Sequence, residues 1–114
     1  VTHHGLPSSN NPALVLAIDP SVAVMCNGPT KGGHPQTLKT LHAVKSLEAL
    51  YQLHRNVKLD ESEQTPAKFI ANSEPTENCE GVWVLASVAP DGNMYTVQIG
   101  AEGQPHNYTP RPTR

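Results

Sequence analysis

The stretch from Cys26 to Pro35, with the sequence CNGPTKGGHP, constrains the fold more than any other part of the chain. Its two prolines and three glycines cannot continue a strand, so they predict a loop at residues 27–36. An apolar run precedes this loop and a helical pattern follows it. The loop therefore separates a predicted strand from a predicted helix, and the rest of the chain carries no catalytic motif.

The segments on either side of this loop differ in their hydrophobic period. Two short apolar runs, 13–18 and 21–26, are rich in β-branched residues and predict two strands. After Thr37, apolar residues recur at steps of three and four, which predicts an amphipathic helix of about 17 residues with Thr37 as its N-cap. The recurring positions are Leu38, Leu41, Val44, Leu47, Leu50, Tyr51 and His54.

The second half of the chain predicts further strands. Residues 67–71 fit a short strand, and residues 81–88 and 94–99 fit two strands joined by a turn that contains Gly92. The expected fold class is therefore α+β, an antiparallel sheet of about five strands with one main helix packed on one face. We expect residues 1–114 to form a single domain, in which residues 1–11 and 100–114 are flexible tails.

Size and charge exclude several classes of protein. The chain has 114 residues, enough for one small domain with a modest core. Its net charge of -2 provides no electrostatic surface for nucleic acid or for an anionic membrane. No apolar run is long enough to cross a bilayer. We therefore expect neither nucleic acid nor membrane as a partner.

The two cysteines, Cys26 and Cys79, permit two interpretations. A disulfide between them would close a long loop and contribute roughly 4 kcal/mol in the chain-entropy model. The alternative is two buried, unpaired thiols in a cytosolic protein. The composition, rich in Pro, Gly, Ser and Asn, is typical of secreted proteins and favours the disulfide.

Catalytic and metal-binding chemistry find little support in the sequence. The six histidines include no pair at the four-residue helical spacing of a hydrolytic zinc site, so we expect no metal and no other cofactor. A cysteine among Val and Met, such as Cys26, is more often buried or disulfide-bonded than nucleophilic. The acidic run Asp60, Glu61 and Glu63 is typical of a solvated loop. We therefore expect that the protein is not an enzyme.

Long, proline-bracketed loops on a small sheet suit protease inhibition, because an inhibitor of this kind presents a rigid, substrate-like segment to the protease. The stretch from Cys26 to Pro35 resembles the signature of the subtilisin inhibitor family of Streptomyces, with Cys26, Gly32, His34 and Pro35 at the family spacing. Further similar segments follow in the same order across residues 12–99. They are Pro12-Ala13-Leu14-Val15-Leu16, Leu47-Glu48-Ala49-Leu50 and Glu80-Gly81-Val82-Trp83.

The chain departs from the family at the inhibitory loop. The second signature cysteine of the family falls on Leu41, so the disulfide that pins the loop is missing. Alignment on Glu74-Pro75 places the reactive bond near Ala71 and Asn72, whereas alignment on Thr65-Pro66 places it near Ser62 and Glu63. Side-chain chemistry favours Lys68 or Phe69, which suit a basic or apolar specificity pocket. The inhibitory-loop candidates are Lys68, Phe69, Ala71 and Asn72.

The resemblance implies a secreted inhibitor of subtilisin-like serine proteases that docks a loop within residues 60–75 into the protease. In this interpretation a disulfide between Cys26 and Cys79 braces the scaffold, and His34 and Pro35 shape the loop before the helix. The resemblance also implies a homodimer through the sheet. The alternative is a divergent binding or interaction module on the same scaffold that lacks inhibitory activity.

Overall fold

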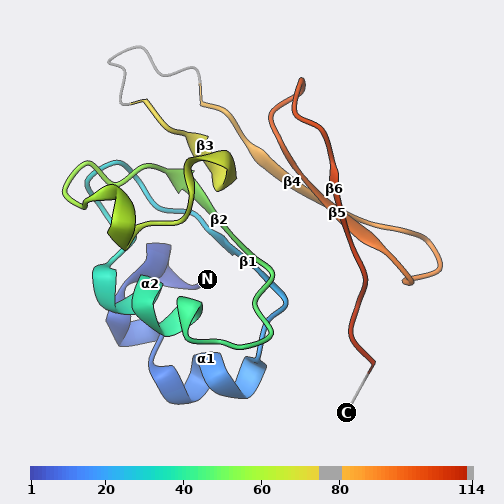
Figure 1. Ribbon diagram of the computed structural model, residues 1–114, viewed down its shortest axis with the longest axis horizontal. Coiled ribbons are helices and arrows are strands. Elements are labelled where there is room, and N and C mark those ends of the chain that lie inside the picture. The colour runs from blue at the N-terminus through green and yellow to red at the C-terminus, as the bar shows by residue number, and fades with distance from the viewer. Residues whose placement is uncertain (75–80, 113–114) are drawn as a thin grey trace.

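The computed structural model describes residues 1–74 and 81–112. Within these residues two helices, α1 and α2, precede most of the sheet structure, and six strands form two separate three-stranded sheets (Figure 1). The helices are α1 (Pro12–Ile18) and α2 (Pro35–His42). The strands are β1 (Val22–Met25), β2 (Ala49–His54), β3 (Ile70–Asn72), β4 (Val84–Val88), β5 (Tyr95–Ile99) and β6 (His106–Tyr108). Four short 3-10 turns, at His3–Gly5, Pro7–Ser9, Glu61–Glu63 and Ala67–Phe69, complete the described structure.

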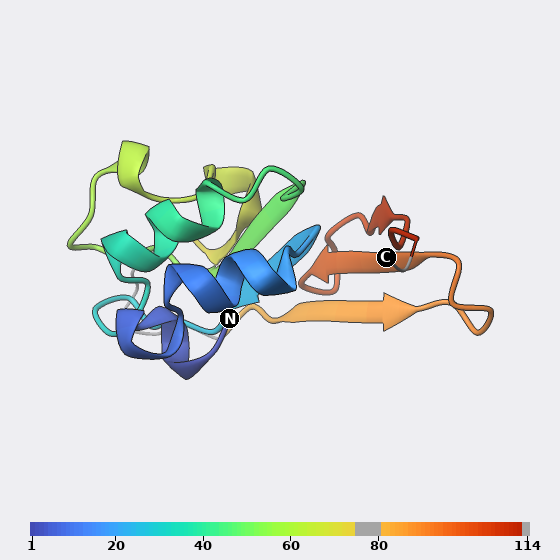
Figure 2. The same cartoon turned by 90° about the horizontal axis from the view of Figure 1, so that it is seen from below.

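The first sheet is parallel, with β2 between β1 and β3. In the register of this sheet Val22 lies opposite Ala49, and Gln52 lies opposite Ile70. Helix α2 connects β1 to β2, as parallel neighbours require a crossover. The second sheet is antiparallel in the order β4-β5-β6 and extends away from the rest of the molecule (Figure 2).

Three layers result from side chains that alternate along β1 and β2. Ala23, Met25 and Leu50 point toward the helices, where they pack with Val15 of α1 and Leu38 of α2. The residues between them point to the opposite face and pack on the antiparallel sheet. This second cluster has Ala49, Tyr51 and Val97 at its centre and Val22, Val24, Phe69, Val84, Ile99 and Tyr108 around them. The parallel sheet is therefore covered on both faces.

The predicted fold class is wrong in its sheet and in its helices. We expected one antiparallel sheet of about five strands with one main helix, whereas the structure has two sheets of three strands, one of them parallel, and two helices. The reason is that β2 is buried on both faces. Its first four residues, Ala49, Leu50, Tyr51 and Gln52, are all buried, so the strand shows no period of two.

Two local predictions exchange helix and strand. The predicted strand at 13–18 is helix α1, because the Asn11 side chain accepts a hydrogen bond from Leu14 N (3.0 Å) and Pro12 occupies the first turn. The predicted helix from Thr37 ends at His42, and its second half includes strand β2. His34, rather than Thr37, is the N-cap of α2, because His34 Nδ1 accepts a hydrogen bond from Gln36 N (3.3 Å).

The predicted tails contain regular structure. His3–Gly5 and Pro7–Ser9 form 3-10 turns, and the Asn10 side chain, which is buried, donates hydrogen bonds to Thr2 O and Leu6 O. At the other end, residues 106–108 pair with β5 as strand β6. The Asn10 bonds hold the N-terminal segment together, and Val1 N, which donates to Val24 O at 2.9 Å, ties this segment to β1.

Tyr51 joins the two sheets through a hydrogen bond. Its side chain is fully buried, and its hydroxyl lies 2.7 Å from the hydroxyl of Tyr108 on β6. Burial raises the pKa of Tyr51 well above its usual value, and the hydrogen bond with Tyr108 raises this pKa further. The phenol therefore keeps its proton in the folded protein at pH values where an exposed tyrosine ionises.

We predict that the protein loses stability in alkaline solution because of Tyr51. Above about pH 10 the unfolded chain binds fewer protons than the folded one, so the free energy of unfolding falls by up to about 1.4 kcal/mol per pH unit. Urea unfolding at pH 9, 10 and 11 measures this slope. Tyr51→Phe should make the slope shallower, and an equal slope in both proteins would contradict the prediction.

Candidate functional site

The predicted inhibitory-loop residues belong to the scaffold. Lys68 and Phe69 lie in the 3-10 turn before β3, and Ala71 and Asn72 lie in β3 itself, paired with β2. The Phe69 ring packs edge-on against Tyr51 at 5.2 Å between centroids, and Lys68 Nζ lies 4.9 Å from the Phe69 centroid. An extended, exposed segment of the kind that docks into a protease is therefore not formed by these four residues.

Asn72 connects the end of β3 to the segment that enters β4. Its side-chain nitrogen donates to Leu53 O and Val82 O, each at 2.8 Å, and its side-chain oxygen accepts from Val82 N at 2.8 Å. The Asn72 side chain thus satisfies both backbone groups of Val82, as a neighbouring strand would. This residue, predicted near a reactive bond, holds the two sheets together.

The predicted disulfide is only half described. Cys26 is exposed, directly follows β1 and forms no disulfide with any residue that the structure describes, and its carbonyl lies 2.8 Å from His4 Nδ1. Cys79 lies outside the described residues. The pairing of Cys26 with Cys79 therefore stays a prediction.

The loop after β1 is closely packed against the N-terminal segment. Gly33 N donates to His4 O at 2.8 Å, and Asn27, which is buried, donates from its side chain to His54 O at 2.8 Å. Gly32 and Gly33 both have positive φ angles, which glycine tolerates and other residues rarely adopt. The Cys26 to Pro35 stretch is thus a structural element that fixes the start of α2.

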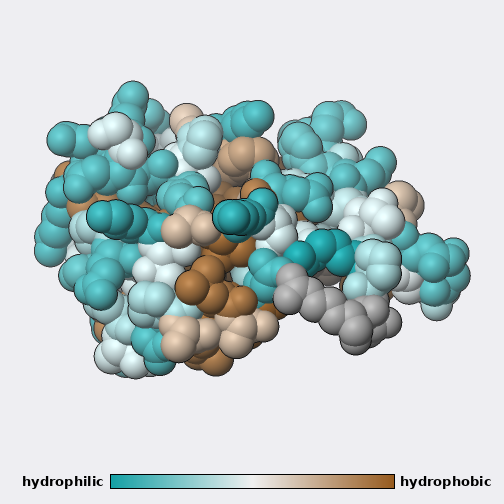
Figure 3. All heavy atoms as spheres, turned by 60° about the horizontal axis from the view of Figure 1, so that its bottom comes forward, coloured by the Kyte–Doolittle hydropathy of each residue, from teal (hydrophilic) through white to brown (hydrophobic). Residues whose placement is uncertain are grey.

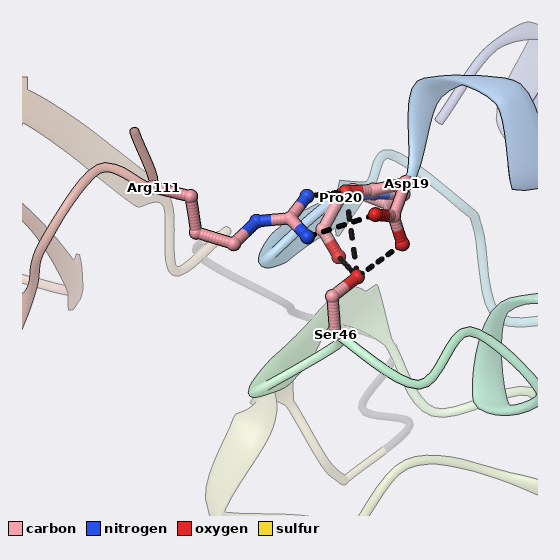
Figure 4. Close-up of polar contacts among 4 residues, drawn as sticks. All are labelled: Asp19, Pro20, Ser46 and Arg111. Atoms are coloured by element: carbon pink, nitrogen blue, oxygen red, sulfur yellow. Dashed lines mark hydrogen bonds and ion pairs between the residues drawn. The ribbon is translucent and has the colours of Figure 1, made fainter. Parts of the chain in front are cut away.

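A polar cluster fastens the C-terminal segment across the end of α1 (Figure 4). Arg111 forms an ion pair with the Asp19 carboxylate (2.8 Å) and donates a hydrogen bond to the Asp19 carbonyl. Ser46 donates to the same carboxylate from the other side. The charges of Asp19 and Arg111 offset each other, and the bonds between these residues hold the C-terminal segment against the end of α1.

Helix α1 exposes several apolar residues on the face that Figure 3 presents, where hydrophobic side chains gather in the middle. They are Leu14, Leu16 and Ile18. Beside them, a cavity of about 240 Å³ is lined in part by Val15, Val22 and Leu41. The adjacent edge of β1 is partly occupied, because Val1 N donates to Val24 O at 2.9 Å.

Strand β4 is an edge strand of the antiparallel sheet, and its backbone geometry identifies which groups point outward. Gly100 N donates to Trp83 O and Ala89 N donates to Met94 O, both at 2.9 Å, so odd-numbered residues of this segment bond to β5. Hydrogen bonding alternates along an antiparallel edge strand. The N–H and C=O groups of Val84, Ala86 and Val88 therefore point away from β5. They pair with no other strand in residues 1–74 and 81–112, and we call them the free edge of β4.

Both ends of this free edge are defined by specific residues. On one side the next outward position is Val82, whose backbone N–H and C=O are already bonded to the Asn72 side chain. On the other side the next outward position is Pro90, which has no N–H. The free edge therefore comprises the outward N–H and C=O groups of three residues.

The free edge of β4 lacks the features by which proteins usually protect an edge strand. No charged residue and no proline occurs from Gly81 to Ala89. Leu85 is 48% exposed and Val88 is 70% exposed. By contrast, β3 and β6 are three residues long, and prolines at 105 and 110 flank β6. Among the edge strands that the structure describes, β4 is the longest and the least protected.

The sequence predicts β4 as a strand but does not indicate that its edge is open. Two features of the sequence are consistent with an unprotected edge, the uncharged run from Val82 to Ala89 and the proline that follows it. What the sequence lacked was the order of the strands. That order decides which strand lies at an edge.

No family model matches the chain, and comparisons with curated proteins and with solved structures found no match either. The resemblance to the Streptomyces subtilisin inhibitors therefore stays a prediction. Across residues 1–74 and 81–112, no three His, Cys, Asp or Glu side chains lie close enough together to hold a metal ion. The same part of the chain contains no helix with the length and hydrophobicity needed to cross a membrane.

Proposed function

We propose that the protein is an interaction module that binds an extended segment of a polypeptide chain as an additional strand beside β4. The observation that carries the proposal is the free edge of β4, whose outward N–H and C=O groups lie on an uncharged, exposed strand. Natural proteins rarely leave such an edge open, because it pairs readily with other chains. Binding of a partner strand would explain why the edge of β4 is unprotected.

Strand addition of this kind has two components. Hydrogen bonds to the backbone of Val84, Ala86 and Val88 would each contribute about 0.5–1.5 kcal/mol. Side chains of the added strand would contact Val84, Ala86 and Val88 on one face and Leu85 on the other. Because none of these residues is charged, the edge favours an apolar segment.

The inhibitor prediction uses a different part of the molecule. Substrate-like docking requires an exposed, extended backbone, whereas Ile70 and Asn72 are buried and β3 is hydrogen-bonded to β2. Titration of subtilisin with the protein tests the inhibitor prediction directly, and absence of stoichiometric inhibition at micromolar concentration would contradict this prediction. The geometry favours the alternative, an interaction module without inhibitory activity.

Replacing Ala86 with proline tests the binding edge. This change removes one outward N–H and no hydrogen bond of the β4–β5 ladder, so the fold should tolerate it. Twelve-residue peptides selected from a displayed random library against the wild-type protein are the probe. We expect these peptides to bind Ala86→Pro at least about tenfold more weakly, which isothermal calorimetry measures.

The matched control is Ala86→Ser, which changes the side chain and keeps the N–H. Peptides should bind this variant with nearly wild-type affinity, and thermal unfolding should show that both variants are folded. Equal binding to the proline and serine variants, or a selection that yields no binding peptide, would contradict the proposal.

A further inference from the structure

We propose that the segment bound by β4 is β4 of a second copy of this chain, paired antiparallel about a two-fold axis at Ala86. The two sheets would then join into one sheet of the order β6-β5-β4-β4-β5-β6. This inference rests on the proposed function, since it uses the same free edge. It rests on the backbone of β4 and not on the resemblance that also implies a homodimer.

The first argument is that the free edge of one copy is complementary to the free edge of a second copy. In a two-fold antiparallel pair centred on Ala86, Val84 lies opposite Val88 of the second copy, and Ala86 lies opposite Ala86. Every outward-pointing residue then faces an outward-pointing residue, and each such pair exchanges two hydrogen bonds. The pairing uses all three residues of the free edge on both copies, with about six hydrogen bonds between the copies.

The second argument is that neighbouring two-fold registers are worse. Centred on Leu85, the pairing would place Val88 opposite Val82, whose N–H and C=O are already bonded to Asn72. Centred on Ser87, it would place Val84 opposite Pro90, which has no N–H to donate. The residues that end the free edge therefore select the register centred on Ala86.

The third argument is the character of the side chains that would meet. Val84 and Val88 of opposite copies form an apolar pair on the face that also carries Val97 and Ile99 of β5. Ala86, the smallest of these residues, lies at the axis and faces Ala86 of the second copy, so no bulky side chains meet there. Leu85 meets Ser87 on the other face. The absence of charge from Gly81 to Ala89 means that no like charges are brought together.

Oligomeric state measures the self-pairing directly. In sedimentation equilibrium from about 10 µM to about 1 mM, we expect the wild-type protein to shift from monomer to dimer, and Ala86→Pro to stay a monomer. A wild-type protein that stays monomeric, a dimer that Ala86→Pro also forms, or assembly beyond a dimer would each overturn the self-pairing. Peptide binding that depends on the Ala86 N–H would still support the proposed function in each case.

Cross-linking tests the register. In a protein with both native cysteines replaced by serine, Ala86→Cys should form a disulfide-linked dimer on mild oxidation, because the paired Cα atoms lie about 5.5 Å apart. The control is Val88→Cys, whose two thiols would be separated by four residues along the strands, about 13 Å. Equal cross-linking of the two variants, or stronger cross-linking of Val88→Cys, would overturn this register.

Discussion

Alanine at position 32 is expected to lower the free energy of unfolding by about 3 kcal/mol or more. Gly32 has a φ angle of +78°, and a Cβ atom there would lie 2.1 Å from the carbonyl oxygen of His4. That oxygen accepts the hydrogen bond from Gly33 N, so it cannot move without breaking the contact between the loop and the N-terminal segment. The losses of stability from backbone strain and from overlap with His4 therefore add.

Gly92→Ala is the matched control for this effect. Gly92 also has a positive φ angle, +71°, but no atom lies within 4 Å of the position that a Cβ would take. We expect a loss of only about 1 kcal/mol, from backbone strain alone. Urea unfolding of both variants measures the difference, and equal losses would show that His4 does not pack against Gly32 as described.

Truncation of Tyr51 to alanine is the second large effect we expect. The side chain is fully buried between the two sheets and contacts Phe69, so its removal leaves a cavity and should lower the free energy of unfolding by about 3–5 kcal/mol. Tyr51→Phe removes only the hydrogen bond with Tyr108 and should lower it by about 1 kcal/mol. Chemical unfolding at neutral pH compares the two variants.

The two substitutions of Tyr51 separate packing from hydrogen bonding. A large loss in both would mean that the hydroxyl pair, rather than the ring, holds the sheets together. A small loss in Tyr51→Ala would contradict the three-layer core, because that core places Tyr51 at the contact between β2 and β5.

The sequence predicts the local structure of the second half of the chain better than that of the first. The hairpin of β4 and β5 is confirmed. Apolar and polar residues alternate along β5, and a turn that contains Gly92 joins it to β4. Strand β1 is confirmed as well. These segments carry their structure in local patterns, which a single sequence contains.

The errors arise where burial on both faces removes the pattern. The apolar residues of β2 also fit the spacing of the preceding helix, and only the two covering layers make this segment a strand. For α1, the sequence contains two helix signals, the capping residue Asn11 and Pro12 in the first turn. The β-branched residues of the run outweighed these signals and led to the prediction of a strand.

The candidate site was less predictable than the fold. The residues predicted for an inhibitory loop, Lys68 to Asn72, are held in place by Tyr51 and by β2, which lie far from them in sequence. The free edge of β4 depends on the order of the strands and on the hydrogen bonds between Asn72 and Val82. Both are tertiary features that no local pattern specifies.

Amide hydrogen exchange at Ala86 tests the central claim most directly, because this N–H donates to no other group of its own sheet. The account predicts that exchange at Ala86 is fast in dilute protein and slows at least about tenfold when the concentration is raised to about 1 mM or when a selected peptide is added. Exchange at Ser87, which faces β5, should be slow throughout. Fast exchange at Ala86 under all of these conditions would contradict the account.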